Sequence, residues 1–248
     1  MCTVSWTLSD GGYEVFFSRD EKRTRAEGEP PRVCRAEGVA WMAPVDPQGG
    51  GTWIWANEYR LTACIMNVYE TCPEADSPGC LSRGLFLQAL APCADVDTLE
   101  RRAHAKLKAH AYRPFFLLAW SETGRPHFWH GCAGEMARLQ TPPQPMLSTS
   151  SFNPRGVLET RRRAFEAVCP PGGMPSPKVL ELFHEDAATK PAAETVRMSR
   201  PDARTVSLTH VRVTSRGIGM KHRPRRNDKD FGRPSVCLLN MAHAGDAA

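Results

Sequence analysis

The sequence predicts an α+β fold in which antiparallel β-sheets are covered by α-helices. Three pairs of short β-rich runs, each pair joined by turn residues, are typical of β-hairpins. Segments with helical periodicity lie between and after them and come in two pairs. With 248 residues, 41% of them hydrophobic, the chain is long enough to bury a full core. Hairpins that alternate with paired helices are typical of sheets packed under helices.

The first predicted hairpin joins residues 2–7 and 13–17 through the turn signal Ser-Asp-Gly-Gly at residues 9–12. In an antiparallel pair with a tight turn, the residue that leaves the second strand lies opposite the residue that enters the first. We therefore expect Arg19 and Asp20 to lie beside the start of the first strand.

Residues 22–51 predict a long loop. They contain four prolines and end in three consecutive glycines, Gly49–Gly51. A loop of this length is rarely without a role in a compact domain. We interpret it as a segment that covers a site.

The remaining elements follow in chain order. Hairpins are predicted at residues 52–67, which brings Asn67 to a strand end, and at residues 115–130. Helices are predicted at residues 85–90 after Ser82, at 99–110 after Asp95 or Asp97, at 157–168 before the Pro170–Gly173 stop, and at 176–183. The last strands are predicted at residues 205–213 and 218–221.

The C-terminal residues predict a flexible, basic tail. Residues 223–248 combine Pro224 and Pro234 with clustered positive charges and a small, polar end, so they bury little apolar surface. Only the apolar residues between 236 and 241 could dock, as a short strand on a sheet edge. We therefore divide the chain into a folded domain, residues 1–222, and a tail, residues 223–248.

Composition narrows the class of protein. The net charge of +5 is modest and no basic patch carries aromatic or groove-reading elements, so we expect no nucleic-acid partner. The triplet Arg161–Arg163 is interpreted as the solvated face of a helix. No apolar run reaches about 18 residues and no secretory signal opens the chain, which favours a cytoplasmic protein without a membrane span. Nine irregularly spaced cysteines do not make a disulfide framework.

Cys2 points most directly to chemistry. Only Met1 precedes it, and cysteine is small enough for initiator methionine to be removed. Cys2 would then carry a thiol and a free α-amine, and this amine titrates at about pH 8 and can take the thiol proton directly or through a water. One residue would supply both nucleophile and base. The alternative is that Cys2 is a small buried residue of an edge strand.

Spaced motifs carry a resemblance to a known family. They lie at residues 1–6, 12–21 (ending Ser18-Arg19-Asp20-Glu21), 50–67, 147–152 and 202–207. In this order they resemble the NRDE family, whose animal members are called transport and Golgi organisation protein 2. They are distantly similar to N-terminal-nucleophile hydrolases of the choloylglycine hydrolase and penicillin V acylase group. The resemblance implies a four-layer αββα sandwich, and the chain departs from the family's Asn at Ser18 and at Thr149.

The resemblance also implies the roles of a site. Cys2 would attack the carbonyl of a small-molecule amide, with a non-peptide C–N bond broken through a thioester and no cofactor. Arg19 would favour the thiolate, Asp20 would orient the α-ammonium or Arg19, and Asn67 would bind the oxyanion. The residues expected to contact substrate are Trp53 and Thr149.

Two other kinds of site were weighed. His127 and His130 would point to opposite faces of a strand and could not share an ion without a bulge, so we expect no metal. Aromatic residues such as Trp53 could line a pocket for an apolar ligand, haem or a lipid, since NRDE relatives have been linked to haem handling and lipid homeostasis. The protein would then be a carrier, or an inactive scaffold that kept the fold.

Overall fold

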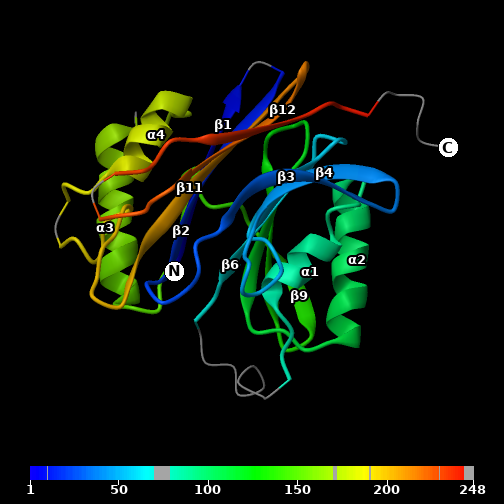
Figure 1. Ribbon diagram of the computed structural model, residues 1–248, viewed down its shortest axis with the longest axis horizontal. Coiled ribbons are helices and arrows are strands. Elements are labelled where there is room, and N and C mark those ends of the chain that lie inside the picture. Colours follow the sequence, from blue (N-terminus) through cyan, green and yellow to red (C-terminus); the bar gives the residue numbers. More distant parts are fainter. Residues whose placement is uncertain (10, 70–78, 170–171, 190, 229, 243–248) are drawn as a thin grey trace.

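The computed structural model describes residues 1–9, 11–69, 79–169, 172–189, 191–228 and 230–242, and it contains two antiparallel β-sheets packed face to face (Figure 1). The six-stranded sheet has the order β10-β1-β2-β11-β12-β13 and the seven-stranded sheet runs from β3 to β9 in sequence order. Helices α3 and α4 cover the outer face of the first sheet, and α1 and α2 cover that of the second. The fold is therefore α+β with four layers, as the sequence predicted.

The elements have the following bounds. The first sheet contains β1 (Cys2–Ser9), β2 (Gly12–Lys22), β10 (Met146–Thr149), β11 (Ala203–Thr214), β12 (Gly217–Pro224) and β13 (Ser235–Leu239). The second contains β3 (Glu29–Ala36), β4 (Val39–Val45), β5 (Ile54–Asn57), β6 (Thr62–Asn67), β7 (Phe115–Trp120), β8 (Pro126–Cys132) and β9 (Glu135–Leu139). The helices are α1 (Arg83–Ala89), α2 (Val96–Ala109), α3 (Pro154–Val168) and α4 (Pro177–Glu185).

The central core lies between the two sheets. Val4 and Trp6 of β1 and Val15 and Phe17 of β2 meet apolar residues of β4 to β8, Trp120 among them. A second core lies between the six-stranded sheet and helices α3 and α4, and a third lies between the seven-stranded sheet and helices α1 and α2. Because strand side chains alternate between faces, each sheet needs a layer on both sides, which accounts for the four layers.

The predicted loop at residues 22–51 is wrong, because most of it forms the hairpin β3–β4. Pro30 and Pro31 lie where the β3–β4 register shifts, on an edge strand, which is where a sheet accepts proline. The turn uses Glu37 and Gly38, both with positive φ, as a two-residue hairpin turn requires. The glycines after β4 do form an irregular connection to β5.

The predicted tail also needs correction. Its described residues include β13, which pairs with β12 along the sheet edge, as its apolar residues allowed. Arg225 and Phe231 are buried, and Arg225 donates to the Met198 carbonyl oxygen at 2.9 Å. The strand β13 and the buried side chains of Arg225 and Phe231 therefore pack onto the fold formed by residues 1–222. Residues 243–248, like Asp10 of the first hairpin turn and Pro170 and Pro171 of the predicted helix stop, lie outside the described residues.

The outer face of β1 and β2 is polar although it is buried. Ser5 of β1 and Ser18 of β2 both contact His184 of α4, at 2.8 Å to Nε2 and 2.7 Å to Nδ1. Ser18, the departure from the family motif, therefore has a partner on the covering helix. Burial, followed by the charge of Arg161, lowers the pKa of His184 to about 3, so the ring is neutral in the folded protein.

None of the helices in the described part of the chain is both long and apolar enough to cross a lipid bilayer.

His184 should make stability fall as pH drops below the ordinary histidine pKa. Its pKa is lowered from 6.5 to about 3 on folding, so only the unfolded chain takes up the proton between these values. The contribution of the neutral His184 ring to the free energy of unfolding is fully present above pH 6.5. As pH falls below this value, the contribution decreases by up to about 1.4 kcal/mol per pH unit. Urea unfolding at pH 7 and pH 5 should show a smaller loss for His184→Gln than for the wild type. The exposed-site control His110→Gln should keep the wild-type loss, and an unchanged loss in His184→Gln would contradict the assignment.

Candidate active site

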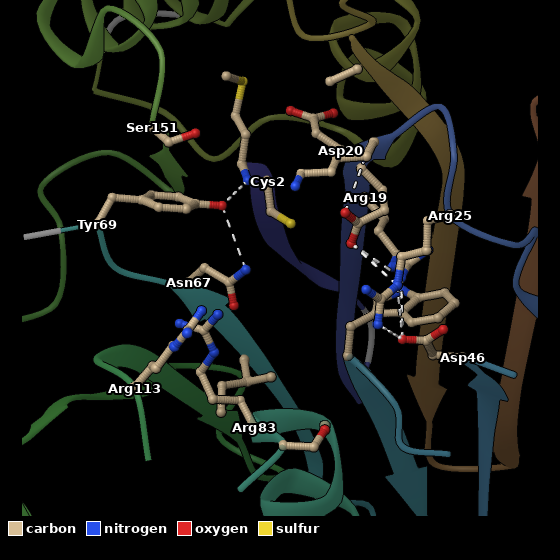
Figure 2. Close-up of a pocket in the computed structure, with 18 of the residues that line it drawn as sticks. Cys2, Arg19, Asp20, Arg25, Asp46, Asn67, Tyr69, Arg83, Arg113 and Ser151 are labelled. Carbon is tan, nitrogen blue, oxygen red and sulfur yellow. Dashed lines mark hydrogen bonds and ion pairs between the residues drawn. The ribbon is translucent and has the colours of Figure 1, made fainter. Parts of the chain in front are cut away.

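The strand register brings the start of β1 into a cavity of about 650 Å³. Cys2 pairs with Arg19 of β2 on one side and with Thr149 of β10 on the other. The predicted placement of Arg19 beside the start of the first strand is therefore confirmed. The cavity is lined by Cys2, Arg19, Asp20, Asn67 and Trp53, so five predicted site residues meet there (Figure 2). Thr149 is adjacent through its strand pairing, and its buried hydroxyl has no hydrogen-bond partner.

The Cys2 thiol is a neutral group in this environment. Burial raises its pKa, and this outweighs the opposing effect of the Met1 ammonium and the smaller one of Arg19. The charge of Arg19 does favour the thiolate, as expected, but its effect is smaller than that of burial. Arg19 also lies over the Trp53 ring, with its guanidinium carbon 4.5 Å from the ring centroid, and reaches Glu21 at 3.4 Å and Asp46 at 3.6 Å. A thiol held in this way needs a base to react.

Asp20 points to the opposite side from Arg19 and is fully buried. Its carboxylate pairs with Arg161 of α3 at 3.0 Å and accepts the Thr205 hydroxyl at 2.6 Å. Of the two roles expected for Asp20, the contact with Arg19 is not made, because neighbouring residues of a strand face opposite ways; the role toward the Cys2 α-ammonium stays a prediction, because Met1 is present. The Asp20 backbone N–H donates to the Met1 carbonyl oxygen at 3.2 Å and so fixes the chain ahead of Cys2.

Arg161 was missed as a site residue. Its guanidinium is fully buried and also donates to the Thr3 hydroxyl at 2.6 Å and to the Glu194 carbonyl oxygen at 3.2 Å. The interpretation of residues 161–163 as a solvated face holds for the other two arginines of the triplet, which pair with exposed glutamates. A signal was present, since Val157, Arg161 and Phe165 fall at helical spacing on one buried face.

Tyr69 is a second residue that the sequence did not indicate. Its hydroxyl accepts hydrogen bonds from the Met1 α-ammonium and, at 3.5 Å, from the Asn67 side-chain amide (Figure 2). Burial raises the pKa of Tyr69, so it is a neutral phenol. Asn67 thus stands at the end of β6 with its amide near the chain terminus. Asn57 lies in the same sequence motif, residues 50–67, but its contacts are structural. Its side-chain amide donates to the carbonyl oxygens of Ala91 and Cys93, in the segment that follows α1.

Charged side chains line the rest of the cavity. On one wall Asp46 lies between Arg25 and Arg19, and hydrogen bonding from Arg25 with the two positive charges holds its pKa low although burial alone would raise it. On the other wall lie Arg83, at the start of α1, and Arg113, just before β7 (Figure 2). Among the residues that the structure describes, no group of three or more His, Cys, Asp or Glu side chains could hold a metal ion.

Comparison with known proteins places the fold. No family model matches the chain, and no curated protein matches it. Penicillin V acylase from Agrobacterium tumefaciens is similar at 16% identity and a TM-score of 0.56, over 97% of this chain and 86% of that one. A mutant of conjugated bile acid hydrolase from Clostridium perfringens is similar at 11% identity and a TM-score of 0.52, over 97% and 92%. The Caenorhabditis elegans ortholog of N-acylethanolamine-hydrolyzing acid amidase is similar at 11% identity and a TM-score of 0.52, over 95% of this chain and 99% of that one.

These likenesses define a class of fold. The chain has two antiparallel sheets between two helical layers, and its structural neighbours are N-terminal-nucleophile hydrolases. The predicted αββα sandwich of this type is confirmed. The chain spans nearly the full length of these neighbours, so the whole layered architecture is compared and not one piece of it.

Replacing Arg161 should destabilise the protein strongly. Arg161→Met leaves the Asp20 carboxylate buried without its counter-ion, and we expect a loss of about 3–5 kcal/mol in the free energy of unfolding. The control Arg163→Met, two residues along the same helix on its exposed side, should cost less than about 1 kcal/mol. Adding Asp20→Asn to Arg161→Met should recover part of the loss. Equal, small losses for the two arginine variants in urea unfolding would show that the buried pair contributes little.

Proposed function

We propose that this protein is an N-terminal cysteine amidohydrolase that acts on a non-peptide C–N bond of a small substrate. The observation that carries the proposal is the position of Cys2, the first residue of β1, at the wall of a charged cavity with Arg19, Asn67 and Tyr69 around it. The fold shared with acylases and an amidase supports the reaction class. The spaced motifs support membership of the NRDE family.

Removal of Met1 must come before the reaction. While Met1 is present, the Cys2 nitrogen is an amide and cannot act as a base. The Met1 side chain also packs among Val157, Met198 and Ala203, and its ammonium bonds to Tyr69. Removal of Met1 creates the α-amine of Cys2 next to the thiol and opens this corner of the cavity.

The thiol is then activated by its own residue. The Cys2 α-amine takes the thiol proton as sulfur attacks the carbonyl carbon, which gives a tetrahedral intermediate with negative charge on oxygen. The Asn67 amide donates to this oxyanion, an interaction whose loss costs about 10²–10³ in rate in comparable sites. When the intermediate collapses, the α-ammonium gives its proton to the departing amine and a thioester remains. Water then attacks the thioester, with the α-amine as base, and releases the acid.

The raised thiol pKa is compatible with this mechanism. The pKa of the thiol is raised in the chain that carries Met1, and a thiol that is neutral before substrate is attacked gives the adjacent amine of the Met1-free form a defined task as base. Arg19, held by Glu21 and Asp46 over Trp53, acts as a fixed positive wall of the cavity. We propose that Trp53 contacts the substrate from this wall and that Thr149 supports the position of Cys2 through β10.

The carrier hypothesis receives less support. Haem or a lipid would be expected to bind a largely apolar pocket. The cavity is instead lined by several arginines and carboxylates, Arg83 and Asp46 among them.

Activity should require both the Cys2 thiol and removal of Met1. A fusion protein cleaved so that the chain begins with Cys2 should hydrolyse amides, while the same fusion cleaved ahead of Met1 should lose at least about 10³-fold in kcat because its nucleophile lacks the adjacent base. Cys2→Ser in the Met1-free form should lose activity with little change in thermal stability. The control Cys64→Ser, at another buried cysteine, should keep its activity.

Intact mass spectrometry confirms which form is assayed in each case. Equal activity with and without Met1, or an active Cys2→Ser protein, would rule out the mechanism.

A further inference from the structure

The arginines that line the cavity fall into two groups. Arg19 and Arg25 contact Glu21 and Asp46, so their charges are balanced inside the wall they belong to. Arg200 likewise pairs with Asp202 at 3.0 Å. The positive charges of these arginines are therefore balanced by neighbouring carboxylates of the protein itself.

Arg83 and Arg113 differ from this group. Neither makes an ion pair with any carboxylate that the structure describes, although both line the cavity. Arg83 donates to the Pro114 carbonyl oxygen at 2.8 Å, which anchors one nitrogen, Nη1, and leaves the rest of its fork available. In Figure 2 both guanidinium groups lie below Asn67, and the charge of Arg113 acts on Arg83.

The two charges oppose each other. Burial lowers the pKa of Arg83, and the charge of Arg113 lowers it further, while the Tyr69 phenol is a weaker opposing influence than burial. Two like charges that lie near each other, one of them partly buried, repel each other, and an anion bound between them would relieve this repulsion. Paired guanidinium forks match the two oxygens of a carboxylate, which accepts parallel hydrogen bonds from them.

We propose that the substrate is an amide that carries a carboxylate, and that Arg83 and Arg113 bind this carboxylate while the scissile carbonyl lies between Cys2 and Asn67. The inference rests on the proposed amidohydrolase function and names its substrate class. The carboxylate belongs either to the acyl part or to the amine part of the amide. In both cases the arginine pair fixes one end of the substrate and so sets the distance to the thiol.

Matched amides test the proposal on the protein that begins with Cys2. Glutaryl-4-nitroanilide carries a terminal carboxylate and pentanoyl-4-nitroanilide is its neutral counterpart of equal chain length. N-benzoylglycine and N-benzoylethanolamine form the corresponding pair on the amine side. We expect kcat/KM for the carboxylate member of at least one pair to exceed that of its neutral partner by about 10- to 100-fold.

Arginine variants identify the residues responsible. Arg83→Met and Arg113→Met should each reduce that ratio by about 10-fold or more, because only the carboxylate member of a pair loses an ionic partner. Arg113 is exposed, so its variant does not threaten the fold. Lys22→Met is the control, because Lys22 is an exposed cation that lines the same cavity but lies at the end of β2. A ratio near one in the wild type, or an equal drop in Lys22→Met, would overturn the proposal.

Binding separates this proposal from the hydrolase mechanism. If neither pair is hydrolysed, calorimetry of Cys2→Ala protein with the same four amides still measures the preference. Tighter binding of a carboxylate member that is lost in Arg83→Met supports the arginine site even though the proposed reaction has failed. Equal binding of charged and neutral members contradicts the arginine site, whatever the outcome of the activity assay.

Discussion

The buried ion pair between Arg161 and Asp20 ties the candidate site to the rest of the fold. Arg161 belongs to α3 in the outer layer, and Asp20 belongs to β2 beside the first residue of β1. The same guanidinium reaches the Thr3 hydroxyl and the Met1 sulfur, so one side chain fixes both strands that present Cys2. A charge buried this completely is tolerated only with its partner in place. The position of Cys2, the proposed nucleophile, therefore depends on the docking of a helix far away in sequence.

The surroundings of Cys2 divide the tasks of the site. Burial keeps the thiol protonated; in the proposed mechanism the α-amine that follows Met1 removal is the base, and Asn67, at the end of a strand of the other sheet, is the oxyanion donor. In Figure 2 the arginines that contact Asp46 and Glu21 lie on one side of the view, and Arg83 and Arg113, which have no described counter-ion, lie on the other. Cys2 therefore lies between one wall whose positive charges are paired with carboxylates and another wall whose arginines have no described counter-ion.

Local rules were enough to predict the hairpin that brings Arg19 beside Cys2, because the register of a hairpin follows from the position of its turn. They were also enough to predict helices that begin at clear N-caps such as Ser82 and Asp95. They failed at β3, where prolines are accepted because the strand is an edge with a register shift. They also failed for Arg161, where composition suggested a solvated face although its helical spacing matched a buried one. Tyr69, Arg83 and Arg113 gather only through tertiary contacts between separate segments, and no local pattern brings them together.

Trapping the acyl-enzyme tests the central claim most directly. Protein that begins with Cys2 is mixed with a turned-over amide and quenched in acid, since a thioester on Cys2 would otherwise migrate to the neighbouring α-amine. Mass spectrometry of the N-terminal peptide should then show one acyl group on Cys2, removable by hydroxylamine. Product formation without that adduct, or with the acyl group on another residue, would contradict the account.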